Sequence, residues 1–357
     1  MIITKTRIEK FSAPLAGVFT VASGTIDSGD SWIVFIETDA GITGIGAAAP
    51  WGPVTGETLE SCYEVLKMLT ATLPGKDPLD IGGIHQYMDR IIYKNGSAKC
   101  AIDTALYDIA ARAAGLPLYK YLGATCGTVE NDITVGIDEP QLMEEQAGFF
   151  VHDLGFRILK IKIGLNYEHD LDALQRIRKI AGPDVRIRVD ANQGYTREKA
   201  LEVLPAFQEI GIDAVEQFLP SWDFEGSAWL RANNPTKVKI MLDESIHDVH
   251  DAMRASQLQA ADYFNIKLMK CGGIYYGLQI ADIAAAANIN CMVGCMMENK
   301  ISLAAGLSLV AAKQNIVEAD CDSFLVFKNN DDGIVGGFVR DGGRMILSDK
   351  PGLGIEL

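Results

Sequence analysis

The stretch Ile158-Leu-Lys-Ile-Lys-Ile163 decides the fold, because it places two lysines in an otherwise apolar, strand-like run. Residues two apart in a strand share a face, so Lys160 and Lys162 should point to the same side. Residues 171–180 then carry leucines and isoleucines three or four apart, and the helical pattern ends before Gly182-Pro183. A strand, a polar loop and an amphipathic helix together form the unit from which parallel sheets are built.

The same unit recurs along the chain. Residues at or near the C-terminal ends of the strand-like runs are spaced by 24 to 28 positions, at 162, 190, 216, 243, 267, 294 and 320. Strand and helix alternating at this period predict a (β/α) barrel. An open doubly wound sheet is the alternative, but no Gly-x-Gly-x-x-Gly follows a first strand, and charged residues end nearly every strand.

The two ends of the chain have other patterns. Residues 1–125 begin with strands around the turn Asp39-Ala-Gly41 and continue as helices, whereas residues 326–357 contain short strands. We therefore expect a first domain over 1–125, the barrel over 126–325, and C-terminal strands over 326–357 that return to the first domain.

Composition excludes several classes of protein. A formal charge of -15 argues against binding nucleic acid, which needs a positive surface, and a solvated acidic surface explains the charge without any partner. The apolar run at 281–287 is far shorter than the roughly 20 residues of a membrane helix, and the N-terminus shows no export signal. Seven scattered cysteines without a Cys-x-x-Cys pair fit reduced thiols. We expect a cytoplasmic protein with no membrane partner.

Three carboxylates end successive predicted strands: Asp190, Glu216 and Asp243. The C-terminal strand ends of a barrel meet at one mouth, so these side chains should converge there, although each could also be a surface group. Oxygen ligands without histidine or cysteine favour Mg²⁺ over zinc. The sequence therefore predicts a magnesium site.

Lys267 ends the strand four places after that of Lys162, which is the opposite wall of an eight-stranded ring. A substrate held between the two lysines would meet a base on each face, so a carbon next to a carboxylate could lose and regain a proton with inversion. We expect the neighbouring ammonium and the metal to lower the pKa of Lys160 and Lys162 towards the range of a general base. A surface position for Lys267 is the alternative.

Asp320 and Asp322 share one face of the last strand and lie too far around the ring to join the metal ligands. Two carboxylates at this place suit a cation. The alternative is that they cap the next helix or turn.

These residues resemble the enolase superfamily, and Lys160-Ile-Lys162 with Lys267 resembles its muconate-lactonising subgroup. The similarity covers essentially the whole chain. It implies a (β/α)7β modified TIM barrel, an α+β capping domain formed by both chain ends, and a Mg²⁺ that binds a substrate carboxylate beside Lys160. The matching stretches are 159–164, 189–194, 215–217, 243–245 and 265–274.

Within the subgroup, Asp320-Cys-Asp322 resembles the motif with which dipeptide epimerases hold a free α-ammonium. The resemblance implies that Lys162 takes the proton from the L-configured residue of an L-Ala-L-Xaa dipeptide and that Lys267 protonates the opposite face. It implies substrate contacts for Thr134 and for Met296 and Glu298 in the loop after residue 294. Homo-oligomers are common in this family.

Three departures from the family pattern bear on specificity. Phe218 replaces the usual proline after Glu-Gln, and Gly44-Ile-Gly-Ala47 replaces Gly-x-Gly-Glu. Gly24 stands where Ala-Glu epimerases place an arginine for the glutamate side chain. We therefore expect a neutral, hydrophobic or cationic second residue rather than glutamate, with Trp51 as an apolar wall.

Other functions share these lysines and the metal. Within the subgroup they are o-succinylbenzoate synthase, N-succinylamino acid racemase and cycloisomerase, whose substrates have no free ammonium for Asp320 and Asp322. Outside it, the fold could serve an inactive binding or structural protein.

Overall fold

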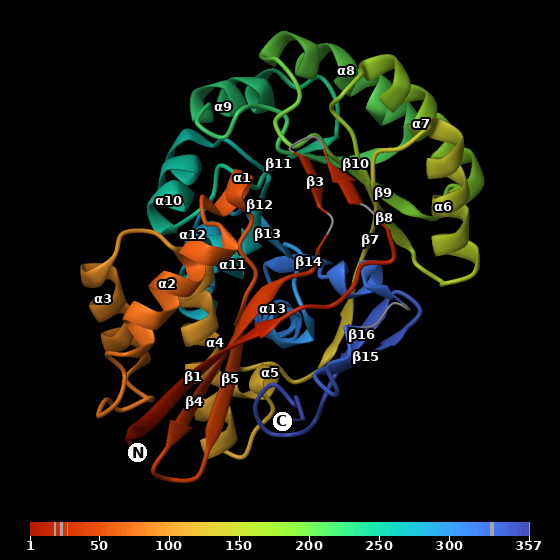
Figure 1. Ribbon diagram of the computed structural model, residues 1–357. Coiled ribbons are helices and arrows are strands. Elements are labelled where there is room, and N and C mark those ends of the chain that lie inside the picture. Colours follow the sequence, from red (N-terminus) through yellow and green to blue (C-terminus); the bar gives the residue numbers. More distant parts are fainter. Residues whose placement is uncertain (18, 22–23, 27, 329–331, 357) are drawn as a thin grey trace.

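The computed structural model describes residues 1–17, 19–21, 24–26, 28–328 and 332–356. Its centre is one sheet of eight parallel strands in chain order (Figure 1). The amide of Asp132 donates to the carbonyl of Ala319 at 3.1 Å, so the first and last strands meet and the sheet forms a nearly closed barrel. The predicted barrel is confirmed. Its strands are β7 (Ile133–Val135), β8 (Ile158–Lys162), β9 (Arg186–Asp190), β10 (Ile212–Glu216), β11 (Lys239–Leu242), β12 (Tyr263–Lys267), β13 (Asn290–Gly294) and β14 (Ile316–Asp320).

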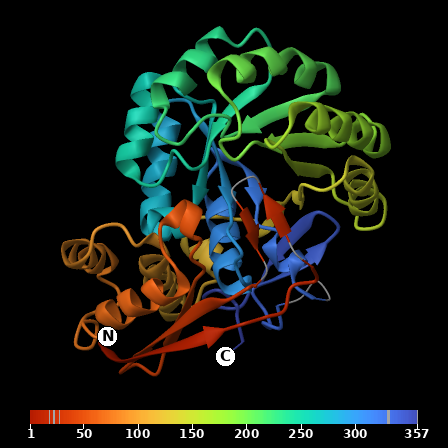
Figure 2. The same ribbon diagram turned by 45° about the horizontal axis from the view of Figure 1, so that its top comes forward.

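Helices join consecutive barrel strands and cover the outside of the barrel (Figures 1 and 2). In the second of them the Asn166 side chain accepts the amide of His169, and Gly182 ends the helix at φ 81°. Ala173, Leu174 and Ile177 lie on its buried face. None of the helices in the described ranges is long and apolar enough to cross a membrane. They are α6 (Pro140–His152), α7 (Tyr167–Ala181), α8 (Arg197–Ile210), α9 (Phe224–Asn233), α10 (Val249–Leu258), α11 (Leu268–Cys271), α12 (Ile274–Ala286) and α13 (Lys300–Ala312).

Strand register brings the charged strand ends level with one another. Lys162 pairs with Asp190, and Asp190 pairs with Glu216. On the other side, Lys267 pairs with Gly294, which pairs with Asp320. Because parallel strands of a barrel end at the same rim, these side chains project into one mouth.

The first part of the chain forms a capping domain beside the barrel (Figure 2). Its antiparallel sheet has the order β1-β4-β5, and Gly44 and Gly46 on β5 lie so close to α4 that a side chain at either would meet the helix backbone. Gly44 and Gly46, the two glycines of the family pattern, therefore serve packing. The elements are β1 (Ile3–Phe11), β2 (Phe19–Val21), β3 (Gly24–Ile26), β4 (Ser31–Thr38), β5 (Thr43–Ala48), α1 (Gly52–Thr55), α2 (Leu59–Thr70), α3 (Ile81–Ile91), α4 (Gly96–Ala113) and α5 (Leu118–Tyr121).

The C-terminal residues contact both parts of the molecule. After the 3₁₀ turn Ser323–Val326, strands β15 (Phe338–Asp341) and β16 (Arg344–Leu347) pair as a hairpin with β6 (Thr128–Glu130), which directly precedes the barrel. The last residues then reach the capping domain: the carbonyl of Gly352 accepts the amide of Leu118 at 2.7 Å. The C-terminal tail thus joins the cap to the barrel.

Candidate active site

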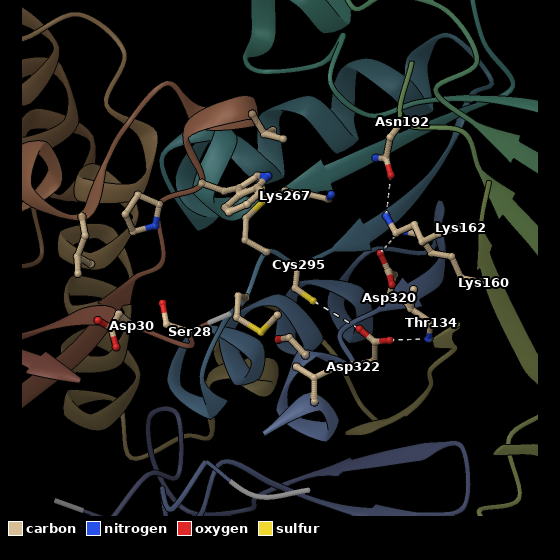
Figure 3. A pocket seen from close by; sticks show the side chains of 18 of the residues that line it. Ser28, Asp30, Thr134, Lys160, Lys162, Asn192, Lys267, Cys295, Asp320 and Asp322 are labelled. Carbon is tan, nitrogen blue, oxygen red and sulfur yellow. Dashed lines mark hydrogen bonds and ion pairs between the residues drawn. The ribbon is translucent and has the colours of Figure 1, made fainter. Parts of the chain in front are cut away.

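A cavity of about 390 Å³ lies at the barrel mouth, where the capping domain faces the strand ends (Figure 3). The barrel contributes most of the polar lining, and the cap contributes apolar side chains together with Ser28, Asp30 and Glu60. Lys267 and Lys162 lie on opposite sides of the cavity, as expected for strands four places apart (Figure 3). The polar residues lining it from the barrel are Thr134, Lys160, Lys162, Asn192, Lys267, Cys295, Asp320, Asp322 and Ser323.

Asp190, Glu216 and Asp243 converge at one side of the mouth, with carboxylate oxygens within 4.8 Å of one another. All three side chains are buried. Burial and the nearby charge of Asp190 raise the pKa of Glu216 to about 8. Three carboxylates packed this closely are stable only beside compensating cations.

The donor set fits a divalent cation. It consists of oxygen atoms alone, which suits Mg²⁺. Asp243 Oδ2 is buried and accepts no hydrogen bond. Lys267 Nζ lies 2.7 Å from this oxygen and forms an ion pair with it, but not in the geometry of a hydrogen bond. This oxygen is therefore available to a metal ion.

The lysines of the mouth contact these carboxylates directly. Lys162 Nζ lies 2.6 Å from Asp190 Oδ2 and 3.2 Å from Asn192 Oδ1. Lys267 Nζ lies beside Asp243 on the opposite wall. The two ammonium groups therefore occupy opposite walls of one cavity, and each pairs with a carboxylate of the Asp190, Glu216 and Asp243 cluster.

Beside the carboxylates alone, with no metal ion bound to them, the pKa of Lys160 is raised rather than lowered. Burial alone would lower its pKa, but the charges of Asp320, Glu216 and Asp190 outweigh burial, and the pKa rises well above its ordinary value. Burial also lowers the pKa of Lys267, but the charge of Asp243 raises it, and the net effect is a raised pKa. The sequence shows that the Lys160 and Lys162 ammonium groups share a face, but the fold also brings carboxylates close to them. These lysines become bases only when another cation engages the carboxylates.

Four residues that the sequence did not single out hold the carboxylate cluster in place. The Gln217 side chain accepts the amide of Asp243 at 2.8 Å, and Asn265 Nδ2 donates to Glu216 Oε1 at 2.7 Å. Lys270 Nζ donates to Asp243 and, at 3.0 Å, to the carbonyl of Asn265. Asn192 donates its amide to Asp190 Oδ1 at 2.9 Å. All four lie in or next to the strands that carry the cluster and the lysines, within the stretches 189–194, 215–217 and 265–274.

Asp320 and Asp322 line the side of the cavity near the seam between β14 and β7. The amide of Thr134 donates to Asp322 Oδ2 at 2.7 Å, and Cys295 Sγ lies 3.8 Å from Asp322 Oδ1. Neither carboxylate caps a helix with its side chain, so the capping alternative fails for the following 3₁₀ turn. Both carboxylates remain accessible from the cavity.

A third carboxylate, Asp132, lies within 4.8 Å of Asp320 and Asp322, measured between oxygens. It is fully buried and contacts the Arg188 guanidinium, which lies 3.0 Å from Glu318 Oε2. This chain of charges fills the barrel below the cavity. The sequence missed it because Arg188 and Asp132 face each other only after the barrel closes.

The remaining predicted site residues have different surroundings. Trp51 and Met296 line the cavity. Glu298 is buried behind it and accepts the amide of Met296 at 2.9 Å, so it shapes the loop rather than the cavity wall. Gly24 begins β3, while neighbouring positions 22 and 23 lie outside the described residues.

His247, near Lys270, gives a prediction for stability. Burial, reinforced by Lys270, lowers the pKa of His247 to about 4. Since an unfolded histidine titrates near 6.5, the unfolded chain binds more protons between roughly pH 6.5 and 4, and this residue destabilises the fold by up to about 3 kcal/mol as the pH falls. Urea unfolding across this window should show a shallower pH dependence in His247→Gln. Equal slopes in both proteins would contradict this.

Comparison with known proteins places these features among relatives. Residues 3–123 match the mandelate racemase / muconate lactonizing enzyme N-terminal domain, and residues 142–357 match the enolase C-terminal domain-like family. A hydrophobic dipeptide epimerase from Enterococcus faecalis is 39% identical, with 100% of both chains covered. An L-Ala-D/L-Glu epimerase from Clostridium acetobutylicum is 38% identical, with 100% of this chain and 99% of the relative covered.

Two further similarities concern a solved structure with a bound dipeptide and a relative with a different named activity. The crystal structure of a dipeptide epimerase from E. faecalis, complexed with Mg and L-Leu-L-Tyr, superposes with a TM-score of 0.96 at 38% identity and full coverage of both chains. An N-succinyl-L-Arg/Lys racemase from Bacillus cereus is 34% identical, with 100% of this chain and 96% of the relative covered. These relatives are named epimerases or racemases.

Proposed function

Because this chain belongs to the enolase superfamily, with the two domains of its mandelate racemase and muconate lactonizing enzyme family, we propose that it is a Mg²⁺-dependent dipeptide epimerase. It inverts the α-carbon of the C-terminal residue in an L-Ala-L-Xaa type dipeptide. The observation that carries the proposal is the pair Asp320 and Asp322 in one cavity with Lys162 and Lys267. These two lysines pair with Asp190 and Asp243 of the buried carboxylate cluster behind the cavity wall. One end of the cavity suits a carboxylate bound to metal, and the other suits a free ammonium.

The chemistry follows from the positions of the lysines. Lys162 removes the α-proton of the L-configured residue, and Lys267 delivers a proton to the opposite face; in the reverse direction the roles exchange. Asp190, Glu216 and Asp243 would hold Mg²⁺, which would supply Lewis-acid stabilisation of the substrate carboxylate when bound. Lys160 adds a positive charge where negative charge develops on the carboxylate oxygens, and such preorganised charge is a large catalytic term.

The cavity lining supports a hydrophobic or cationic Xaa rather than glutamate. Among the described residues, its basic members are the three lysines of the mouth. The capping domain adds two carboxylates, Asp30 and Glu60, and an apolar wall. An acidic side chain would face these carboxylates without a cation of its own. The apolar wall is formed by Pro50, Trp51, Val54 and Leu59 of the cap with Met296, Met297 and Val326 of the barrel.

Racemisation of an N-succinylamino acid is the second candidate, because one relative is named for it. A substrate of that kind has no free ammonium, so Asp322 would have no charged partner. Asp322→Asn should lower kcat/KM for a dipeptide by at least about tenfold, the worth of one charge-assisted hydrogen bond, and leave turnover of an N-succinylamino acid nearly unchanged. Equal loss with both substrates would count against a dipeptide.

A library of dipeptides incubated with the protein and Mg²⁺ in D₂O tests the function itself. An epimerase substrate gains one mass unit at the α-carbon, which identifies the substrate and reaction together. Absence of deuterium from every library member would contradict the proposal and favour a binding or structural role. N-succinylamino acids in the same screen test the second candidate.

A further inference from the structure

Lys160 lies between the two ends of the proposed dipeptide site. Its Nζ is 2.7 Å from Asp320 Oδ2, but 3.2 Å from Glu216 Oε2 and 3.4 Å from Asp190 Oδ2. The shortest of these ion pairs is therefore with Asp320, the carboxylate that we propose binds the substrate ammonium. The longer two are with the carboxylate cluster. Figure 3 shows Lys160 and Asp320 side by side.

The lysine is the partner that can move. Asp320 has a short side chain on β14, whose backbone is fixed by pairing with β13, and Asp322 is held by the amide of Thr134. A lysine has a flexible four-carbon stem. Asp132, which lies beside Asp320, already pairs with the Arg188 guanidinium, whereas Asp320 pairs with Lys160. Any cation that binds Asp320 therefore competes with Lys160.

We propose that the free ammonium of the dipeptide displaces Lys160 from Asp320 and thereby releases it to the reacting carboxylate. This inference rests on the proposed function and adds a coupling between the ammonium end and the carboxylate end of the dipeptide site. Without a second cation, Lys160 pairs with Asp320 and contributes less positive charge where the enolate oxygens develop. With the ammonium on Asp320, the lysine turns to those oxygens. The ammonium thus acts on the rate as well as on binding.

Positive charge on the metal side strengthens this arrangement. A dication held by Asp190, Glu216 and Asp243 would repel the Lys160 ammonium towards Asp320 until another negative charge binds. That charge is the substrate carboxylate, whose contact with Lys160 becomes stronger as it gains enolate character. Release of Lys160 should therefore raise kcat, because the gained interaction is greatest in the transition state.

The test compares L-Ala-L-Leu with N-propionyl-L-leucine, which differs by replacement of the ammonium with hydrogen. In the wild-type protein, kcat for racemisation of the propionyl compound should be at least about tenfold below kcat for the dipeptide, the worth of one charged hydrogen bond. In Asp320→Asn, Lys160 is already released. Its kcat for the propionyl compound should rise about tenfold above wild type, since the ion pair with Asp320 is gone.

Asp322→Asn is the matched control, because Asp322 also faces the cavity but forms no ion pair with Lys160. Asp322→Asn should lower kcat/KM for the dipeptide without raising kcat for the propionyl compound. Calorimetric binding of N-propionyl-L-leucine with Mg²⁺ gives a second readout: affinity should increase in Asp320→Asn and stay unchanged in Asp322→Asn.

Equal or lower kcat and affinity for the propionyl compound in Asp320→Asn would overturn the coupling. Failure of the proposed function is a different result, namely no turnover of any dipeptide by the wild-type protein. In that case the calorimetric comparison still decides whether Asp320 holds Lys160 away from a carboxylate ligand.

Discussion

Replacing Lys267 by alanine should abolish epimerisation while leaving proton exchange at the L-configured residue. Lys162 still reaches the α-proton from its own wall, where its Nζ contacts Asp190 and Asn192. Nothing then protonates the opposite face, so epimerisation should fall by about 10³-fold or more, within the range of a positioned acid or base. The measurement follows α-carbon deuteration and diastereomer ratio of one dipeptide in D₂O by NMR.

Lys162→Ala is the mirror control for this experiment. It should lose exchange of the L,L-dipeptide and retain exchange of the L,D-dipeptide through Lys267. Circular dichroism and Tm confirm that both variants fold, since each removes one cation from a buried ion pair. Loss of both exchange reactions in either variant would contradict independent roles for the two lysines.

Removing the divalent cation should eliminate activity and lower Tm, and Mg²⁺ should restore both. The buried cluster of Asp190, Glu216 and Asp243 is stabilised by any cation that binds only the folded chain. Glu216→Gln removes one charged ligand. Its metal affinity should fall at least about 100-fold, because even residues that only support the ligands account for losses of 10- to 100-fold.

Titration with Mn²⁺, followed by electron paramagnetic resonance, measures this affinity without relying on turnover. Glu298→Gln is the control, since Glu298 is equally buried but bonds the amide of Met296 instead of belonging to the cluster. Unchanged metal binding in Glu216→Gln would place the metal elsewhere. Reduced binding in Glu298→Gln would show that the loss is unspecific.

The barrel could be predicted from the sequence because its period is local. A strand, a loop and a helix recur every 24 to 28 residues, and the charged residue at each strand end marks the rim. Lys162, Asp190 and Glu216 follow from this rule alone, since their strands are neighbours in register. The same rule places Lys267 on the opposite wall.

Contacts across the barrel and its seam could not be predicted in this way. Thr134 and Asp322 are separated by 188 positions and meet only because β7 and β14 adjoin. The pairing of Lys160 with Asp320 also depends on closure, and it reverses the expected direction of the lysine pKa. Strand spacing gives a residue's height along the barrel axis but not its partner on another wall.

Specificity was the least predictable part of the site. Met296 and Glu298 are two residues apart in one loop, yet Met296 lines the cavity and Glu298 lies behind it. Asp30 and Glu60 reach the cavity from the capping domain, which strand-end spacing does not describe. Such loop positions follow from packing between the two domains.

The most direct test of two-base epimerisation is the isotope content of the first product formed in D₂O. L-Ala-L-Leu, or the best substrate of the library screen, is followed at low conversion, and the α-position of the D-configured product is measured by mass spectrometry. Because the proton leaves to Lys162 and a different ammonium, that of Lys267, protonates the product, every product molecule should carry deuterium. Product that retains the substrate's own hydrogen would contradict the two-base mechanism.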